Sequence, residues 1–303
     1  KLSIKEHWEF KKRKIYKNDL LEELEFLIKD SIKIRNRSDV KLGLYYSKGL
    51  DSSLLRLLGN YRNLIFFDDK KNYIKDFNKN LKKIAYHLDF PVGSLSSYPL
   101  YKLAKKAKQK NIKVILSGEG ADEVFGGYVR HIPIAKLYYM NKRFPSYKPM
   151  FEKINSSYSD IYAKLICRDK NYNFVSKKIS KYFELFEDPI NAMGFIDFKF
   201  IMPSLLQMGD RMSSAYSLEN RCPFLDKRII EFGFSLEPEM KIDNFKQKKL
   251  LFDLFDKRNK KFKIIKEKKG LSFNYNTWYN SKDQKRKKYF LLLNKTWKKC
   301  FNL

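Results

Sequence analysis

Apolar residues follow two different spacings along the first part of the chain. Residues 19–34 carry leucine and isoleucine at helical spacing, which predicts an amphipathic helix. Downstream, short apolar runs predict strands at 42–46, 63–67 and 113–116, and helical spacing returns at 52–58 and 101–111. Strands that alternate with helices predict an α/β fold with a doubly wound parallel sheet. Beyond about residue 129 the pattern becomes mostly helical, so we expect additional C-terminal helices.

The chain is strongly basic, with a net charge of +30 over 303 residues. Such a charge is typical of nucleic-acid binders. Lysine greatly outnumbers arginine, however, and asparagine, isoleucine, phenylalanine and tyrosine are also abundant, all of which have AT-rich codons. Base recognition favours the bidentate contacts of arginine, which is scarce here. We therefore attribute the charge to genome composition and do not expect a nucleic-acid partner.

Cysteine and histidine residues are too scattered to predict a disulfide or a metal site. Three of each occur, at 167, 222 and 300 and at 7, 87 and 131, and no CxxC pair is present. Free cysteines favour a reducing compartment. The segment 1–19 is polar and basic, unlike a signal peptide, and no apolar run approaches the roughly 20 residues of a membrane helix. We therefore expect a cytoplasmic protein without a membrane partner.

The polar segment Ser47–Ser53, with the sequence SKGLDSS, lies between a predicted strand and a predicted helix. Backbone NH groups of such a turn form an anion nest, and the amino end of the following helix adds positive potential. These features predict a pyrophosphate loop in which Asp51 would hold Mg²⁺ or orient the loop. The alternative is an ordinary turn that Asp51 or a serine caps. The Walker A phosphate-loop sequence is absent.

A second polar loop follows the strand at 113–116, in the sequence VILSGEGADEVFGGY (114–128). Its closely spaced glycines permit a ligand to approach the backbone. Glu119, Asp122 and Glu123 place three carboxylates within five residues, and their mutual repulsion calls for a cation. A magnesium ion that bridges these carboxylates to a pyrophosphate would supply it. The alternative is a solvated acidic turn.

Together the two loops resemble those of a known family. SKGLDSS is similar to the SGGxDSS loop of N-type ATP pyrophosphatases, and SGEGADEVFGGY resembles the matching segment of asparagine synthetases almost residue for residue. Residues 208–242 and 266–273 resemble two later signatures of the same family. The similarity extends from about Trp8 to about Trp278. The chain thus resembles the synthetase domain of glutamine-dependent asparagine synthetases, which has an adenine nucleotide α-hydrolase-like (PP-loop) fold.

The resemblance implies a ligase that forms an amide with ATP and Mg²⁺. A substrate carboxylate, aspartate in the family, attacks the α-phosphorus of ATP to give an acyl-adenylate and Mg-pyrophosphate. Ammonia then displaces AMP. A glycine-lined loop and Mg²⁺ are suited to this reaction because they stabilise charge on the leaving pyrophosphate.

Family motifs assign roles to individual positions of this sequence. Glu119 would take a proton from the attacking ammonia, with a pKa raised by the neighbouring Asp122. Lys268 would contact the α-phosphate region, unless it is one more solvated lysine in a lysine run. Asp51 and Asp122 would hold magnesium. The resemblance places the nucleotide and its pyrophosphate against Tyr45, Ser47, Gly49, Asp51, Ser52, Ser53, Phe66, Ser117 and Gly118.

Arg211 is a further candidate for the acyl site. Its structural alternative is a salt bridge with Asp210 or Glu219. We expect residues 1–40 to form a linker and a lead-in helix, 41–130 a nucleotide-binding core, and 131–303 a mostly helical part that completes the acyl site. No glutaminase domain occurs within the 303 residues, so we expect the nitrogen to come from free ammonia or from a separate or upstream glutaminase.

Two departures from the family pattern leave other functions open. Lys48 replaces the second loop glycine, and the interval between Phe66 and the YHLDFP segment (86–91) is short, as if a helix and a strand were lost. A lysine forced to positive φ costs on the order of 1 kcal/mol or more, whereas at negative φ its ammonium could contact a phosphate or Asp51. The alternatives are a related amidotransferase or cyclase with another carboxylate substrate, a tRNA-modifying PP-loop enzyme, and a catalytically weakened remnant.

Overall fold

A computed structural model describes residues 8–13, 15, 19–67, 73–90, 96–147, 157–167, 171–243, 246–259, 263–265 and 282–301. The strands are β1 (Leu42–Tyr45), β2 (Leu64–Ile65), β3 (Val114–Leu116), β4 (Glu219–Arg221), β5 (Ile242–Asp243) and β6 (Lys246–Gln247). The longer helices are α1 (Leu20–Arg35), α2 (Leu50–Gly59), α3 (Tyr73–Leu88), α4 (Ser97–Gln109), α5 (Ala121–Phe125), α6 (Ile132–Arg143), α8 (Tyr158–Ile166), α9 (Tyr172–Leu185), α10 (Pro189–Phe200), α11 (Met202–Ser214), α12 (Lys227–Phe234), α13 (Lys249–Arg258) and α14 (Lys282–Cys300). Short 3-10 turns are η2 (Val129–His131), η3 (Pro145–Tyr147), η4 (Pro223–Leu225) and η5 (Pro238–Met240).

The chain forms two compact units, each assembled from three separate segments. The first unit comprises Lys1–Ser31, Glu119–Met202 and Phe224–Arg258. The second comprises Ile32–Gly118, Pro203–Pro223 and Asn259–Leu303, and contains the main sheet. None of the described helices is long and apolar enough to cross a membrane.

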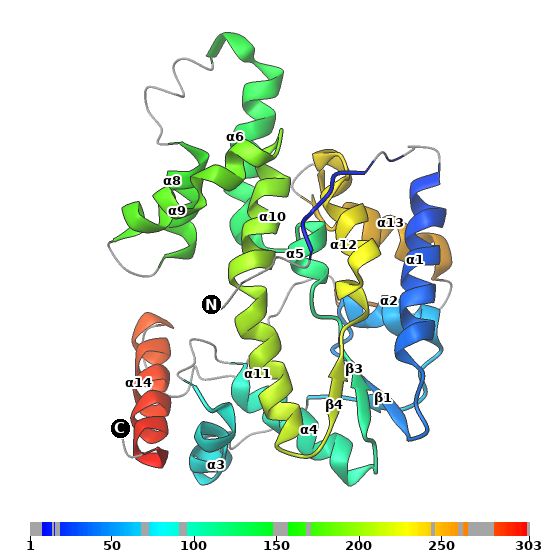
Figure 1. The fold of residues 1–303 in the computed structure, drawn as a ribbon, viewed down its shortest axis with the longest axis vertical. Coiled ribbons are helices and arrows are strands. Elements are labelled where there is room, and N and C mark those ends of the chain that lie inside the picture. The colour runs from blue at the N-terminus through cyan, green and yellow to red at the C-terminus, as the bar shows by residue number, and fades with distance from the viewer. Residues whose placement is uncertain are drawn as a thin grey trace, which may run out of the picture. The chain divides into compact units, whose positions relative to one another are not determined.

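The main sheet confirms the predicted parallel α/β architecture. Its strands lie in the order β2-β1-β3-β4, and each neighbouring pair is parallel. Leu44 pairs with both Leu64 of β2 and Leu116 of β3, so β1 is central. Figure 1 shows β1, β3 and β4 side by side. Because the chain runs from β1 to one side and later returns to its other side, the topological switch point lies between β1 and β3.

The three predicted strands and the three predicted helices correspond to β1, β2, β3, α1, α2 and α4. The pattern did not predict β4, because its sequence Glu-Asn-Arg is entirely polar and it lies at one end of the sheet. An edge strand buries less surface than a central one, so polar side chains are tolerated there. The helices α3 and α14 were also not assigned from the sequence.

The core of the second unit has two clusters. In one, Leu103, Ala104 and Ala107 of α4 pack against Tyr45 and Ile115 of the sheet. In the other, α3 and α14 lie side by side, as Figure 1 shows, and share a core with residues of α4 and α11. The fully buried residues Phe77, Ile84, Tyr98, Met212 and Leu293 belong to it. The α4 cluster thus fixes one face of the sheet beneath the polar loops.

The first unit packs α10 and α12 tightly on the short helix α5. A β-carbon at Gly194 of α10 would lie 2.5 Å from the carbonyl oxygen of Glu123, and one at Gly233 of α12 would lie 2.1 Å from a methyl carbon of Val124. Only glycine permits this approach. Aromatic rings fill the remaining space, with Phe195 and Phe234 at a centroid distance of 5.3 Å. The segment that follows the second polar loop is therefore rigidly held.

Candidate active site

The loop after β1 is organised by hydroxyl groups. The backbone NH of Ser47 donates to the Oγ of Ser52 at 3.2 Å, and the NH of Gly49 donates to the Oγ of Ser47 at 3.2 Å. Ser52 in turn donates to the carbonyl of Gly49 at 3.2 Å. The N-cap of α2 is Gly49, which has no side chain that could cap the helix. The pyrophosphate loop therefore stays a prediction, which the positive potential at the amino end of α2 favours.

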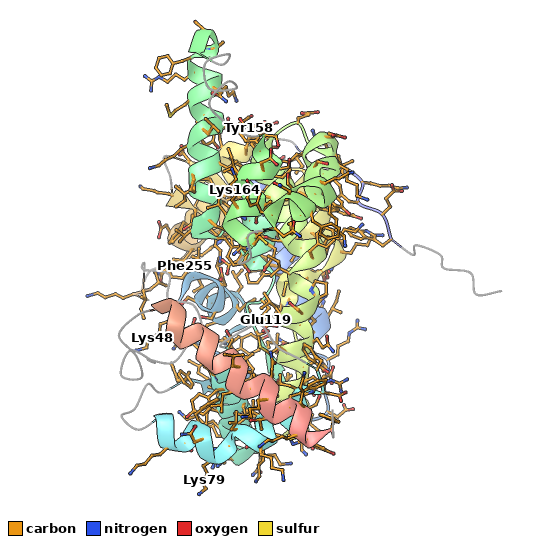
Figure 2. All side chains as sticks on the ribbon, turned by 90° about the vertical axis from the view of Figure 1, so that its left-hand side faces the viewer. Lys48, Lys79, Glu119, Tyr158, Lys164 and Phe255 are labelled. Atoms are coloured by element: carbon orange, nitrogen blue, oxygen red, sulfur yellow. The ribbon has the colours of Figure 1, made fainter. Side chains whose placement is uncertain are left out.

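Lys48 adopts the left-handed conformation, with a φ of 62°. Of the two conformations considered for this residue, the structure thus has the strained one, at a cost of about 1 kcal/mol. Its side chain, labelled in Figure 2, is exposed. Its carbonyl oxygen accepts a hydrogen bond of 2.9 Å from the NH of Ile265. That bond ties the loop to the segment that leads towards Lys268, which itself lies outside the described residues.

The loop after β3 meets the loop after β1 at the switch point. A β-carbon at Gly118 would lie 2.9 Å from the β-carbon of Asp51 and 3.5 Å from the NH of Ser52. Ser117 is buried and is anchored from β4, since its NH donates to the carbonyl of Arg221 at 3.0 Å. The structure therefore brings Ser47, Gly49, Asp51, Ser52, Ser53, Ser117 and Gly118 together in one unit. Ligands of open α/β sheets bind at this position.

The two aromatic residues predicted to line the nucleotide differ in exposure. Tyr45 is buried in the core, with its hydroxyl 3.5 Å from the Oγ of Ser213. Phe66 is 38% exposed at the end of β2 and contacts the ring of Tyr46 edge to face, at a centroid distance of 5.4 Å. Phe66 therefore offers a ring surface to a ligand, whereas the side chain of Tyr45 is enclosed by protein.

Asp122, predicted to hold magnesium, has a partner that the sequence reading did not include. The ammonium of Lys248 lies 2.6 Å from one oxygen of Asp122, and Lys248 is buried. A β-carbon at Gly127 would lie 1.9 Å from the same oxygen and 2.2 Å from the ε-carbon of Lys248. The pair therefore depends on a glycine beside it. Among the described residues, no three side chains of His, Cys, Asp or Glu form a ready-made metal site.

Glu119, labelled in Figure 2, is partly buried. Glu119 and Asp122 both belong to the first unit. The carboxyl group of this loop with a strongly shifted pKa is that of Glu123. Burial, together with the charge of Asp122, raises the pKa of Glu123 to about 7. The hydroxyl of Tyr128 donates a hydrogen bond to this carboxyl. Asp122 thus helps to raise the pKa of Glu123, and the same effect on Glu119 stays a prediction.

A buried polar network fixes the segment that follows α5. The carboxylate of Asp197 is fully buried and accepts from Arg130 at 2.7 Å and from the hydroxyl of Tyr162 at 2.5 Å. The Nε2 of His131 lies 2.8 Å from the same carboxylate. The guanidinium of Arg130 also covers the ring of Tyr128, 3.6 Å from its centroid. The network thereby connects α10 to the end of the glycine-rich segment.

Arg211 forms an ion pair, but with neither expected partner. Its guanidinium lies 3.4 Å from the carboxylate of Asp89, whereas Glu219 is paired with Arg221 at 2.8 Å. The sequence reading was therefore wrong about the partner, because Asp89 is distant in sequence and no local spacing indicates it. The Arg211 side chain is 42% exposed, so part of it stays accessible.

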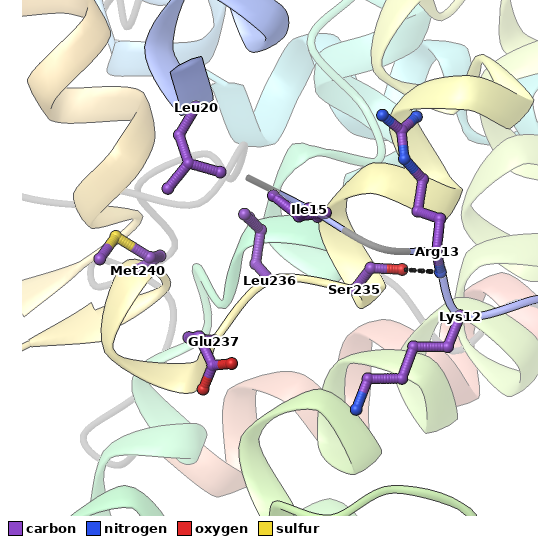
Figure 3. Close-up of a pocket in the computed structure, with 8 residues that line it drawn as sticks. All are labelled: Lys12, Arg13, Ile15, Leu20, Ser235, Leu236, Glu237 and Met240. Carbon is purple, nitrogen blue, oxygen red and sulfur yellow. Dashed lines mark hydrogen bonds between the residues drawn. The ribbon is translucent and has the colours of Figure 1, made fainter. Parts of the chain in front are cut away.

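A separate pocket of about 200 Å³ lies within the first unit, and Figure 3 shows its walls. The NH of Arg13 donates to the Oγ of Ser235 at 2.9 Å at its rim. None of the residues predicted for the active site lines it. We assign it no role in the chemistry of the two loops.

The two loops and their position at the switch point match the motifs of one family, and a family comparison agrees. A model for asparagine synthase matches residues 73–292. The chain belongs to the asparagine synthase family. The fold is accordingly the adenine nucleotide α-hydrolase-like fold with a PP-loop.

Curated relatives carry the same family name. Asparagine synthetase 1 (glutamine-hydrolyzing) of Bacillus subtilis strain 168 is 28% identical over 305 residues, which cover 80% of this chain and 48% of the relative. Putative asparagine synthetase 2 (glutamine-hydrolyzing) of Methanocaldococcus jannaschii is 35% identical over 167 residues, 45% of this chain and 32% of the relative. A putative asparagine synthetase of Mycobacterium bovis is 25% identical over 281 residues and is covered to 43%. The chain thus spans less than half the length of these relatives.

Lys248, the partner of a predicted site residue in this asparagine synthase family member, was not singled out from the sequence. It stands in the lysine-rich stretch FKQKK, where neither charge nor spacing distinguishes it from its neighbours. Only its burial and its contact with Asp122 do so. In a basic chain an isolated acidic or apolar residue can be recognised from the sequence as a candidate, whereas one lysine among many cannot.

Proposed function

We propose that the chain catalyses ATP-dependent amide formation through an acyl-adenylate, with aspartate as the acceptor and ammonia as the nitrogen donor. The observation that carries the proposal is the meeting of the two loops at the sheet's switch point, beside the amino end of α2. Family membership supports the same reaction class.

In the first step a carboxylate oxygen of aspartate attacks the α-phosphorus of ATP, and the bond to pyrophosphate breaks. Backbone NH groups of the Ser47–Ser53 loop and the amino end of α2 would hold the pyrophosphate. The described part of that loop carries a left-handed residue and mutually bonded hydroxyls, which fix its backbone before substrate arrives. Such preorganised donors stabilise developing charge without reorganisation.

In the second step ammonia attacks the acyl carbon and AMP leaves. Glu119 would take the proton from the attacking nitrogen. Phe66, Ser117 and Gly118 would enclose the AMP portion, and Tyr45, whose side chain is buried, would contact it through its backbone. Arg211 would bind the acyl group, and Lys268 would contact the α-phosphate. The products are asparagine, AMP and pyrophosphate, with one proton released.

Magnesium fits the carboxylates that are present. Mg²⁺ in nucleotide sites is usually held by one or two carboxylates together with substrate phosphates and water. Asp51 lies beside Gly118 at the start of α2, and one oxygen of Asp122 is engaged by Lys248. When bound, Mg²⁺ would neutralise charge on the leaving pyrophosphate. Lys248 would orient the Asp122 carboxylate for that purpose.

The test is pyrophosphate release from ATP by the purified chain, measured with ammonia and a panel of amino acids. We expect release to depend on aspartate and an equal amount of amide to form. Release with a different carboxylate and not with aspartate would show a related amidotransferase or cyclase. A separate or upstream glutaminase would supply ammonia in the cell.

One observation favours a second candidate function, that of a weakened synthetase. Lys48 retains the left-handed conformation that suits glycine and adds a side chain at the pyrophosphate loop. If this lysine impairs the site, Lys48→Gly will raise the rate sharply from near zero. If it assists, Lys48→Gly will change the rate modestly and Lys48→Glu will abolish it.

A further inference from the structure

Strand β2 ends the sheet, and its outer side has carbonyl groups that no strand pairs with among the described residues. The NH groups of Leu44 and Tyr46 donate to the carbonyls of Asn63 and Ile65 at 3.0 and 2.9 Å. Carbonyl directions alternate along a strand, so those of Leu64 and Phe66 point to the outer edge. An unpaired edge carbonyl needs another donor.

Lys106 of α4 and Lys110, which directly follows that helix, supply these donors. The ammonium of Lys106 donates to the carbonyl of Phe66 at 3.0 Å, and that of Lys110 donates to the carbonyl of Leu64 at 3.4 Å. The spacing matches, because four residues of helix span about 6 Å and two residues of strand about 6.6 Å. Two lysine ammonium groups therefore provide hydrogen-bond donors to carbonyls that a neighbouring strand would otherwise pair. Lys106 makes the shorter bond and is the less exposed of the two.

The carbonyl that Lys106 binds belongs to Phe66, whose ring is linked to the polar loop through Tyr46. Phe66 contacts Tyr46 edge to face, and the hydroxyl of Tyr46 accepts from the Oγ of Ser53 at 3.4 Å. Beside the strand edge lies a pocket of about 410 Å³, which Phe66, Lys106 and Lys110 help to line. The ring of Phe66 is thus fixed on one side by Tyr46 and is open on another.

We propose that Lys106 is a positioning residue that holds Phe66 as the base-side wall of the nucleotide site, with Lys110 as a second anchor. The proposal rests on the proposed ATP-dependent function and deepens it. It also explains how the wall that would face the nucleotide base can be held in place although the segment between Phe66 and residue 86 is short. Lys106 touches no reacting group, and its effect passes through the backbone of Phe66.

The experiment compares Lys106→Met with Lys106→Arg and with the control Lys108→Met, an exposed lysine of the same helix. Calorimetry with Mg²⁺ measures the affinity of each protein for ATP and for inorganic pyrophosphate. We expect Lys106→Met to weaken ATP binding about tenfold, the scale of one lost charge-assisted hydrogen bond. Pyrophosphate binding should stay within about twofold, because the Ser47–Ser53 loop is untouched. Lys106→Arg should restore ATP binding, and Lys108→Met should match wild type.

Amide hydrogen exchange over residues 64–67 gives a readout that needs no nucleotide. Lys106→Met should accelerate exchange there, and Lys108→Met should not. Unchanged exchange, or equal ATP affinity in Lys106→Met and wild type, would overturn the positioning role while leaving the proposed function intact. Equal losses for ATP and pyrophosphate would also overturn it, since they indicate a general structural effect. Failure of the wild-type chain to bind ATP would instead contradict the proposed function.

Discussion

The two polar loops each have a residue in the left-handed conformation, but one loop has glycine there and the other has lysine. In the loop after β3, Gly120 has a φ of 93°, whereas in the loop after β1, Lys48 has a φ of 62°. A β-carbon at Gly120 would lie 2.3 Å from a methyl carbon of Leu225, so both conformation and space require glycine. Lys48 is exposed, so its side chain costs only backbone strain.

The difference shows which features of the site the fold enforces. Gly120 lies among packed side chains next to α5, and a substitution there must disturb the first unit. Lys48 faces solvent, so the fold tolerates a residue that a pyrophosphate loop would not ordinarily have. Backbone strain at Lys48 that costs the fold little stability can still affect function, because a ligand would approach the same loop backbone.

The largest expected effect is that of Glu119→Gln in the loop after β3. We expect amide formation to fall about 10²–10⁴-fold, because a base is needed when ammonia attacks. Isotope exchange between pyrophosphate and ATP should stay largely intact, since adenylation needs no such base. Exchange and product yield measured on the same preparation check this. Equal losses of both would place Glu119 in the first step.

Gly120→Ala tests whether this loop is as constrained as its packing indicates. Left-handed strain and the contact with Leu225 should together lower the free energy of unfolding by about 2–4 kcal/mol. Gly49→Ala is the matched control, because Gly49 has a φ of −78° and an added β-carbon would approach only the hydroxyl of Ser47, at 3.2 Å. Denaturant unfolding measures both. Similar losses in the free energy of unfolding for the two variants would show that the loop after β3 is no more constrained than the loop after β1.

Lys48 is exposed and has a strained backbone, whereas a second lysine, Lys241, has a buried side chain. Its ammonium is fully enclosed, lies 4.6 Å from the centroid of the Phe234 ring and has no hydrogen-bond partner. Burial lowers the pKa of Lys241 from 10.5 to about 7, and Asp188 offsets this only in part. Between pH 7 and 10.5 the unfolded chain therefore binds more protons, so wild-type stability should rise with pH across that window.

Lys241→Met should remove this rise and stabilise the protein by roughly 1–4 kcal/mol at pH 7, where the cost of the buried amine is still largely present. Unfolding at pH 7 and at pH 9.5 checks the difference between the two proteins. Lys142→Met, at an exposed ion pair with Glu239, serves as the control and should leave the slope unchanged. A wild-type stability that is flat across the window would contradict the expectation.

The smallest expected effect is that of Lys48→Gly on stability. Relief of strain favours the variant by about 1 kcal/mol, and the entropy of glycine in the unfolded chain offsets most of this. We expect a net change within about 0.5 kcal/mol. Lys48→Ala keeps the strain and removes the exposed side chain beyond the β-carbon, so it should also be nearly neutral. A loss above about 1 kcal/mol in either variant would show that the lysine side chain supports the fold.

The parallel sheet and the two loops were predictable because their signals are local. Short apolar runs followed by serine, glycine and aspartate mark strand ends, and β1 and β3 carry such runs. Strand β4 was not predicted because its three residues are polar. The partner of Arg211 was not predicted because Asp89 is distant from it in the sequence. The buried pair of Lys248 and Asp122 depends on packing around Gly127, which no sequence period encodes.

The backbone conformation of Lys48 could not be predicted from the sequence either. The family pattern indicated glycine at this position, but only the structure shows that the chain keeps a φ of 62° with a lysine there. The same holds for the edge of β2, where the short interval after Phe66 indicated a lost strand. The bonds from Lys106 of α4 and from Lys110, directly after that helix, to the edge carbonyls depend on how the helix lies against the strand, which the sequence does not state.

The most direct test of the proposed site is a calorimetric titration of the chain with ATP, in Mg²⁺ and in EDTA, for wild type and Asp51→Asn. A pyrophosphate loop that binds through Mg²⁺ should give wild-type affinity at least about tenfold higher in Mg²⁺ than in EDTA. Asp51→Asn should lose most of that difference, because the carboxylate beside Gly118 is removed. Equal affinity of the wild-type chain for ATP in Mg²⁺ and in EDTA would contradict the assignment.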